Sequence, residues 1–176
     1  MRVIGGEFRS RRLKSPPAAD IRPTPDRLRE TLFDVLAPRI AKTVFLDAYA
    51  GSGAVGIEAL SRGARRAIFI ERSRGAVNII RENLASLQIA DRAEILAGKT
   101  LSVLPRARAD IVFLDPPYSL EREYKEAMEL LGDDGETCLV VAQHSVHLQL
   151  AAQFGRLQHT RMIRQSDNCL SFFESV

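Results

Sequence analysis

The sequence predicts an α/β fold in which a mostly parallel sheet is covered by helices on both faces. From residue 43 onward, short apolar runs alternate with segments of helical period, which is the pattern of successive βα units. Most of these apolar runs contain no polar residue, as expected for strands that are buried on both faces. The chain has 176 residues, of which 45% are apolar and 27% charged, and these values are typical of a soluble globular domain.

The N-terminal 30 residues carry an uneven share of the charge. They contain eight Arg or Lys residues and four acids, whereas the whole chain has a net charge of only +3. Apolar residues alternate loosely over residues 1–14 around Gly5-Gly6, which predicts a small β-hairpin. We expect residues 1–20 to form a basic arm and residues 21–176 the main domain. Such an arm indicates a polyanionic partner, although a solvated basic tail would have the same composition.

A first helix is expected after the linker at residues 15–20. Thr24 is a suitable N-cap, Pro25 suits the first helical position, and Asp26 favours the first turn. Pro38 limits the helix. The apolar residues that follow at helical spacing are Leu28, Leu32, Val35 and Leu36.

The main domain continues as alternating strands and helices. Strands are expected at about residues 43–47, 66–71, 93–96, 110–114 and 137–142, and helices at about residues 53–62, 74–88 and 120–131, with a short helix before Pro105. Gly132 is expected to end the last of these helices. Residues 154–163 and 168–174 are typical of an antiparallel hairpin that closes one edge of the sheet, so that the sheet has seven strands.

The turn after the first strand predicts a site for a nucleoside cofactor. Gly51, Gly53 and Gly56 have the spacing G-x-G-x-x-G, which lets the backbone approach a ligand at a helix N-terminus. Glu71 lies 20 residues after Gly51 and ends the second strand. An acid at that place can accept hydrogen bonds from both hydroxyls of a ribose. The alternative is a βα turn whose glycines serve the backbone alone.

A second candidate site, Asp115-Pro-Pro-Tyr118, follows the fourth strand. In an open α/β sheet, ligands bind outside the carboxyl ends of the strands where the winding reverses, so this loop should face the glycine loop. Two prolines extend the backbone and leave carbonyls without neighbouring N–H groups. A carboxylate and a carbonyl can hold the exocyclic amine of a nucleobase and stabilise the charge that develops as it attacks, while Tyr118 can stack on the base. The alternative is a rigid turn.

Together, these motifs resemble those of class I S-adenosylmethionine-dependent methyltransferases that act on amines. Residues 47–53 resemble the first motif of that superfamily, Glu71 its ribose-binding acid, and residues 115–118 its Asp/Asn-Pro-Pro-aromatic motif. The N-terminal stretches Ile4-Gly-Gly6, Arg11-Arg-Leu13 and Arg22-Pro-Thr24 are similar to the RsmD-type family, which methylates the N2 amine of a guanine in 16S ribosomal RNA. The resemblance implies a Rossmann-like fold with an antiparallel C-terminal strand. It also implies a monomer that uses S-adenosylmethionine and acts on 16S RNA or on the small-subunit particle.

The resemblance also implies roles for individual residues. The catalytic residues would be Asp115, Pro116, Pro117 and Tyr118. Cofactor binding would involve Asp47, Ala50, Gly51, Ser52, Gly53, Glu71, Arg72, Gly98, Lys99 and Asp115. RNA binding would involve Arg2, Arg9, Arg11, Arg12, Lys14, Arg22 and Thr24. The sequence departs from the pattern at Gly98-Lys99, where such enzymes often carry an acid or amide near the adenine, so adenine contacts there are expected from the backbone.

Other functions compete with this one. A nicotinamide-dependent dehydrogenase would explain the glycines and Glu71, but it leaves no role for Asp-Pro-Pro-Tyr and needs a substrate domain. A non-enzymatic RNA-binding module would leave both strand-end acids unexplained. The same chemistry on adenine N6 or cytosine N4 stays open. Without a target-recognition domain, structured RNA is favoured over sequence-specific DNA as the substrate.

The remaining features indicate a cytoplasmic protein. Cys138 and Cys169 lie in apolar contexts and are expected to be reduced thiols. No apolar run approaches the length that crosses a membrane, and the N-terminus lacks a signal-peptide core, so no membrane partner is expected. The three histidines are scattered, and no Cys/His cluster has metal-ligand spacing, so no metal is expected.

Overall fold

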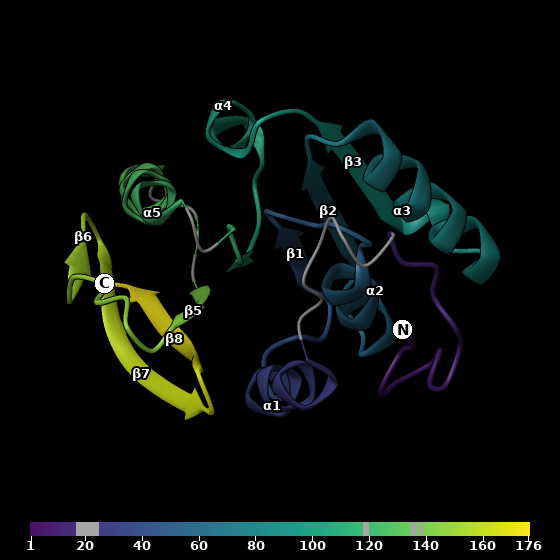
Figure 1. The fold of residues 1–176 in the computed structure, drawn as a ribbon, viewed down its shortest axis with the longest axis horizontal. Coiled ribbons are helices and arrows are strands. Elements are labelled where there is room, and N and C mark those ends of the chain that lie inside the picture. The colour runs from purple at the N-terminus through teal and green to yellow at the C-terminus, as the bar shows by residue number, and fades with distance from the viewer. Residues whose placement is uncertain (17–24, 118–119, 135–136, 138) are drawn as a thin grey trace.

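A computed structural model describes residues 1–16, 25–117, 120–134, 137 and 139–176 of the chain. The strands are β1 (Val44–Asp47), β2 (Arg66–Glu71), β3 (Ala93–Ala97), β4 (Ile111–Leu114), β5 (Leu139–Ser145), β6 (Gln153–Phe154), β7 (Leu157–Gln165) and β8 (Asn168–Ser175). They form one eight-stranded sheet in the order β3-β2-β1-β4-β5-β8-β7-β6. Figure 1 shows this sheet with helices on both of its faces.

The winding of the sheet reverses between β1 and β4. Strand β1 pairs in parallel with β2 on one side and with β4 on the other, and β2–β3 and β4–β5 are parallel as well. Strands β8, β7 and β6 then continue the sheet in antiparallel fashion beyond β5. The carboxyl ends of β1 and β4 therefore flank the switch point where α/β sheets bind their ligands, as the sequence predicts.

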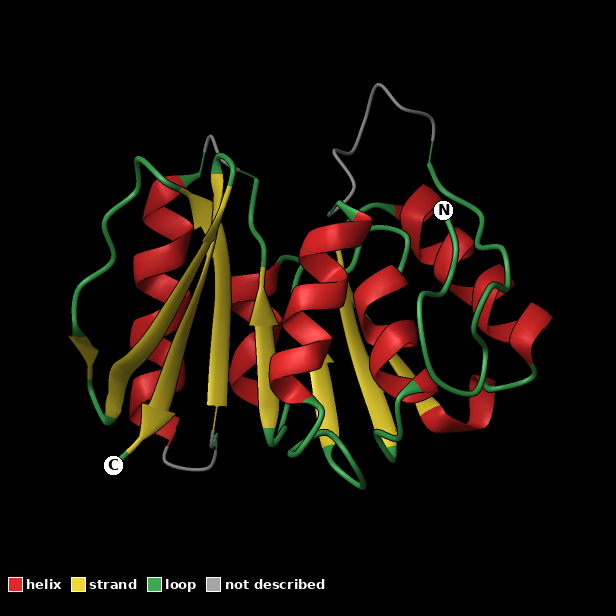
Figure 2. Ribbon diagram, turned by 90° about the horizontal axis from the view of Figure 1, so that it is seen from below, coloured by secondary structure: helices red, strands yellow, loops and turns green. Residues whose placement is uncertain are grey.

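Helices cover both faces of the sheet (Figures 1 and 2). The first face carries α1 (Asp26–Leu36), α2 (Ala54–Ser61) and α3 (Arg74–Leu87), and apolar residues of these helices are buried against Phe45, Phe69 and Phe113 of the strands. The second face carries α4 (Thr100–Val103) and α5 (Glu121–Asp134), where α5 is buried against Val112 and Val140. Short 3-10 turns, η1 (Ala90–Arg92) and η2 (Leu104–Arg106), precede β3 and β4.

The sheet has one strand more than the sequence predicts. The two-residue strand β6 pairs with the start of β7, with Phe154 opposite Leu157. Gly132 does not end α5, because it lies inside that helix. A side chain at Gly132 would overlap the carbonyl of Phe154, so the glycine serves the close approach of β6 to the helix. The prediction of a helix stop was wrong because glycine can mark either role in a sequence.

The start of α1 differs by one residue from the expectation. Pro25 is the N-cap, with an extended ψ of 138°, rather than the first helical residue. Arg22, Thr24, Tyr118 and Cys138, which the sequence analysis singled out, lie outside the described residues. Within the described ranges, no helix is long and apolar enough to span a lipid bilayer.

The N-terminal segment folds back on itself and lies against the helices of the first face (Figure 2). Arg2 and Arg12 form a single antiparallel bridge, and the Leu13 N–H donates to the Met1 carbonyl at 3.0 Å. The predicted hairpin is therefore an isolated bridge rather than two strands. Val3 and Leu13 are buried in the cluster between α2 and α3, so the segment contributes to the core.

Candidate active site

The carboxyl ends of the parallel strands open into a cavity of about 690 Å³. This volume is in the range of pockets that bind small molecules and cofactors. The cavity is lined by both predicted motifs, because its walls include Asp47, Ala50, Gly51, Ser52, Glu71, Arg72, Lys99, Asp115, Pro116 and Pro117. Of the other predicted cofactor residues, Gly53 and Gly98 do not line it. The glycine loop and the loop after β4 thus share one ligand-sized space.

The glycine loop joins β1 to α2 in a conformation that requires glycine. Gly51 and Gly53 have φ angles of 54° and 79°, in the left-handed region that side chains disfavour. Gly53 is the N-cap of α2, and its N–H donates to the Ala50 carbonyl at 2.7 Å. Gly56 serves packing instead, because a side chain there would overlap the ring of Phe69. The N-terminus of α2 is therefore held directly beneath the cavity.

Asp47 anchors this turn from the end of β1. Its side chain is buried, and its Oδ2 accepts a hydrogen bond from the Gly56 N–H at 3.0 Å. Burial raises the pKa of Asp47 to about 7, and the nearby charge of Glu71 adds to this rise, while the Gly56 N–H opposes it. The carboxyl group therefore holds the first turn of α2 in place.

Glu71 joins the two loops that border the cofactor side of the cavity. Its Oε2 accepts a hydrogen bond from the Gly51 N–H at 2.9 Å, and its Oε1 accepts one from the Ser73 N–H at 2.7 Å. Ser73 in turn caps α3, since its Oγ accepts from the Ala76 N–H. Each carboxylate oxygen can accept a second hydrogen bond, so Glu71 keeps the capacity to bind two hydroxyl groups.

The loop after β4 offers acceptors on the other side. Asp115 is half-buried, Pro116 is buried and Pro117 is exposed. The two prolines were expected to leave carbonyls without N–H groups to pair them, and this prediction is wrong for Pro117, whose carbonyl accepts a hydrogen bond from the Leu120 N–H at 2.8 Å. The Pro116 carbonyl is reached by the Tyr124 hydroxyl at a long 3.4 Å. Asp115 and the Pro116 carbonyl are therefore the candidate acceptors of this loop.

Residues from other elements, which the sequence motifs do not indicate, also line the cavity. They include Arg29 of α1, Gln143 of β5 and Asn168 of β8. The β4–β5 register pairs Leu114 with Ala142, which places Gln143 level with Asp115. In the sequence, Gln143 is a polar residue that follows an apolar run, which is a weak signal for such a position because the neighbours of a strand residue depend on the order of the strands.

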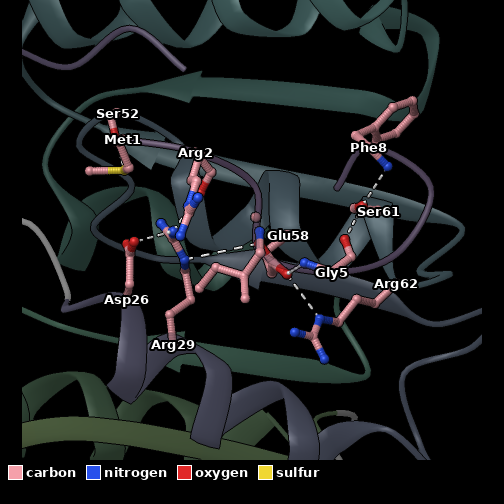
Figure 3. Close-up of polar contacts among 12 residues, drawn as sticks. Met1, Arg2, Gly5, Phe8, Asp26, Arg29, Ser52, Glu58, Ser61 and Arg62 are labelled. Atoms are coloured by element: carbon pink, nitrogen blue, oxygen red, sulfur yellow. Dashed lines mark hydrogen bonds and ion pairs between the residues drawn. The ribbon is translucent and has the colours of Figure 1, made fainter. Parts of the chain in front are cut away.

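Arg29 lines the cavity and also contacts the N-terminal segment, and Figure 3 shows the latter contact. Its side chain is fully buried, and its Nη2 donates to the Arg2 carbonyl at 2.7 Å and to Asp26 Oδ1 at 3.0 Å. Its Nε lies 4.0 Å from Glu58 Oε2. Burial lowers the pKa of Arg29, and the carboxylates of Glu58 and Asp26 oppose that change. The guanidinium is therefore a buried cation that depends on two acids.

Glu58 of α2 is the main acceptor of this buried network. It is fully buried, its Oε2 accepts from the Ile4 N–H and its Oε1 from the Gly5 N–H, both at 2.8 Å. The Arg62 Nε donates to Oε1 at 2.9 Å. Ser61 Oγ donates to the Gly5 carbonyl at 2.6 Å, as Figure 3 also shows. These contacts fasten the N-terminal segment to the main body of the protein.

The N-terminal segment also reaches the glycine loop. Asn83 of α3 accepts from the Lys14 N–H at 2.8 Å and donates to the Ser52 carbonyl at 3.0 Å. Met1 and Pro16 line the cavity. The basic residues expected to bind RNA are all exposed where the structure describes them, namely Arg2, Arg9, Arg11, Arg12 and Lys14. Arg9 lies at the turn that contacts the C-terminal end of α2, whereas Arg2 and Arg12 lie nearer to Met1.

The amino-acid sequence matches a protein family along most of its length. A family model described as Conserved hypothetical protein 95 matches residues 1–174. Ribosomal RNA small subunit methyltransferase D of Escherichia coli (strain K12) is 43% identical over 137 residues, which are 77% of this chain and 68% of that protein. The YlbH protein of Bacillus subtilis (strain 168) is 34% identical over 172 residues, which are 92% of this chain and 91% of that protein.

Solved structures of other proteins have the same fold. The yhhF protein of Escherichia coli has a TM-score of 0.84 at 35% identity, covering 99% of this chain and 97% of that chain. An RNA methyltransferase of Salinibacter ruber, solved in complex with S-adenosyl-L-homocysteine, has the same fold, with a TM-score of 0.68 at 19% identity over 88% of this chain and 94% of that chain. The chain therefore belongs to the Conserved hypothetical protein 95 family, the RsmD-type family of class I S-adenosylmethionine-dependent methyltransferases.

Proposed function

We propose that this protein transfers a methyl group from S-adenosylmethionine to the exocyclic N2 amine of a guanine in 16S ribosomal RNA. One observation carries the proposal: Asp115 and Pro116 line the same cavity as the glycine loop and Glu71. An amine held by the first pair can therefore meet a cofactor held by the second. The names of family members, among them the small-subunit methyltransferase of Escherichia coli, support ribosomal RNA as the substrate.

The reaction requires activation of a weak nucleophile. The lone pair of a guanine N2 amine is delocalised into the ring, so the nitrogen attacks poorly while it is planar. Asp115 and the Pro116 carbonyl can accept the two N–H groups and stabilise the positive charge that develops on the nitrogen. The Asp115 carboxylate can then take the released proton, directly or through water. From its motif, Tyr118 is expected to stack on the base after it has left the RNA stack.

Cofactor binding is assigned to the opposite wall. S-adenosylmethionine supplies an electrophilic methyl group on a positively charged sulfur. Glu71 would accept hydrogen bonds from its ribose hydroxyls, and the amides at the start of α2 would face its methionine portion. Lys99 lines the cavity and would lie near the adenine, although its carbonyl already accepts hydrogen bonds from the Ser102 and Val103 N–H groups. Gly98 does not line the cavity.

Product analysis tests the proposal. The protein is incubated with methyl-labelled cofactor and with small-subunit particles or free 16S RNA from cells that lack it, and the RNA is digested to nucleosides. We expect the label in N2-methylguanosine, and none when large-subunit RNA replaces the small-subunit RNA. Label in N6-methyladenosine or N4-methylcytidine would refute the assignment of the base. Tight cofactor binding without methylation of any RNA would refute the assigned substrate class.

Replacing Glu71 by Ala should weaken binding of S-adenosylmethionine by about 1.5–3 kcal/mol, the range for hydrogen bonds to a charged group. This corresponds to a roughly 10- to 150-fold higher Kd, measured by titration calorimetry. Glu71→Gln, which keeps one acceptor oxygen, should lose less. An unchanged affinity of the Ala variant would contradict the role of Glu71, and tight binding of NADH instead would overturn the cofactor assignment.

Removing the charges of Arg2 and Arg12 should weaken RNA binding and reduce its dependence on salt. If each contacts one phosphate, the slope of log K against log salt should fall by about 1.4–1.8 for the Arg2→Ala, Arg12→Ala double variant. Binding is measured by fluorescence anisotropy at several salt concentrations.

The matched control for this pair is the double variant Arg65→Ala, Arg106→Ala. Both residues are exposed. Arg65 precedes β2 and Arg106 precedes β4, so both lie toward the amino ends of these strands, away from the carboxyl ends that open into the cavity. This control lowers the net charge by the same amount and should change the slope much less. Equal effects of the two double variants would mean that the protein attracts RNA only through its overall charge.

A further inference from the structure

Gln143 lines the cavity, and its side-chain oxygen is a buried acceptor that no residue in the described part of the chain satisfies. The residue is only 3% exposed, and the oxygen in question is Oε1. Buried polar atoms in folded proteins are almost always hydrogen-bonded. An orphaned oxygen in the wall of a ligand cavity therefore points to a donor on the ligand.

The fold places Gln143 next to the proposed amine site. Gln143 lies directly beyond Ala142, which pairs with Leu114, and Asp115 lies directly beyond Leu114. Neighbouring strands of a sheet are about 4.8 Å apart, so the two side chains start from adjacent backbones. The Tyr124 hydroxyl connects the same two segments, because it donates to the Gln143 carbonyl at 2.7 Å and reaches the Pro116 carbonyl at 3.4 Å. Gln143 is thus fixed beside the Asp115–Pro116 acceptor pair.

The bases differ in the atom that lies next to their amine. On the Watson–Crick edge of guanine, the N2 amine is adjacent to N1–H, which is a second donor. On adenine the N6 amine is adjacent to N1, and on cytosine the N4 amine is adjacent to N3, and both of these nitrogens are acceptors. An oxygen beside the amine site can therefore pair with guanine, whereas it would face a lone pair on adenine or cytosine. A flipped base is read through this edge.

We propose that the Gln143 Oε1 accepts a hydrogen bond from N1–H of the target guanine and thereby selects guanine over adenine and cytosine. This inference rests on the proposed guanine N2 activity and adds the group that determines which base is accepted. Gln143 has no part in moving the methyl group or the proton. Its effect is on discrimination between bases, because a site built to hydrogen-bond an N–H rejects a base that lacks it.

The test compares two RNA substrates that both carry the amine. In one, the target is guanine, at the position located by the labelling experiment. In the other, it is 2-aminopurine, which keeps the 2-amino group but has no proton on N1. Single-turnover methyl transfer with the full-length protein should favour guanine, and Gln143→Met should reduce this preference by roughly 10- to 100-fold, the scale for one specific contact to a base. Gln143→Glu keeps an acceptor at the same place and should retain the preference.

Gln165 provides a matched control. Its Oε1 is also buried without a partner among the described residues, but it lies at the end of β7 and does not line the cavity. Gln165→Met should leave the preference for guanine unchanged. Binding of S-adenosylhomocysteine by each variant checks that the cavity is intact.

The outcomes separate this inference from the proposed function. If Gln143→Met methylates guanine and 2-aminopurine with the wild-type ratio, at whatever rate, Gln143 does not read the base and the inference is wrong. If Gln143→Glu loses the preference as fully as Gln143→Met, an acceptor is not what the site provides, and the inference is again wrong. If the wild-type protein methylates no guanine at all, the proposed function itself fails.

Discussion

Replacing Asp115 by Ala is expected to reduce single-turnover methyl transfer by roughly 10²- to 10³-fold, the scale for losing one group that stabilises developing charge. We expect this loss because Asp115 and Pro116 line the cavity, where we propose that the Asp115 carboxylate and the Pro116 carbonyl accept the two N–H groups of the amine. The rate is measured in single turnover with saturating cofactor and small-subunit RNA or particles, so that it reports the methyl-transfer step.

Two controls accompany the Asp115 variant. Binding of S-adenosylmethionine should largely survive, because Glu71 and the glycine loop lie on the other wall. Asp115→Asn keeps one acceptor oxygen in the same place but cannot take the proton, so its rate should lie between those of the wild type and of Asp115→Ala. A near-normal rate for Asp115→Ala would exclude the proposed acceptor pair.

The second large effect is expected from Glu58. Replacing Glu58 by Ala should lower the free energy of unfolding by about 3–5 kcal/mol, the cost of breaking a buried ion pair by removing one partner. The variant leaves the fully buried Arg29 with Asp26 as its remaining carboxylate, and it leaves the Ile4 and Gly5 N–H groups without their acceptor. Unfolding by urea at neutral pH measures the change.

An exposed ion pair between the N-terminal segment and α3 provides the comparison for Glu58. Glu82 pairs with Lys14 at 2.7 Å, and both side chains are more than half exposed. Glu82→Ala should therefore change the free energy of unfolding by less than about 1 kcal/mol. If Glu58→Ala were as mild as Glu82→Ala, the N-terminal segment would not be held to the protein through the buried network.

The elements with strong local signals followed well from the sequence. The helix expected at residues 74–88 is α3, at Arg74–Leu87, because its apolar period and its capping residue are both local. The strand expected at residues 66–71 is β2, with the same bounds. The conformation of Gly51 and Gly53 was predictable for a similar reason, since a tight strand-to-helix turn needs residues that tolerate a positive φ.

The residues that sequence analysis missed depend on contacts between distant segments. Glu58 and Arg29 lie on helices, where charged residues usually face water, and their contacts with the backbone of the N-terminal segment are tertiary contacts. Gln143 gains its position from the pairing of β4 with β5, and the order of strands is not visible in a window of sequence. Gly132 was misread because the approach of β6 to α5 is also a tertiary contact.

The most direct test of the proposed function is the pattern of methylated nucleosides in cells that lack this protein. Small-subunit RNA is purified from wild-type and deletion cells, digested to nucleosides and analysed by mass spectrometry. The proposal predicts that one N2-methylguanosine is lost in the deletion, and that it returns with the wild-type gene but not with Asp115→Ala. An unchanged content of N2-methylguanosine, together with the loss of a methylated adenine or cytosine, would contradict it.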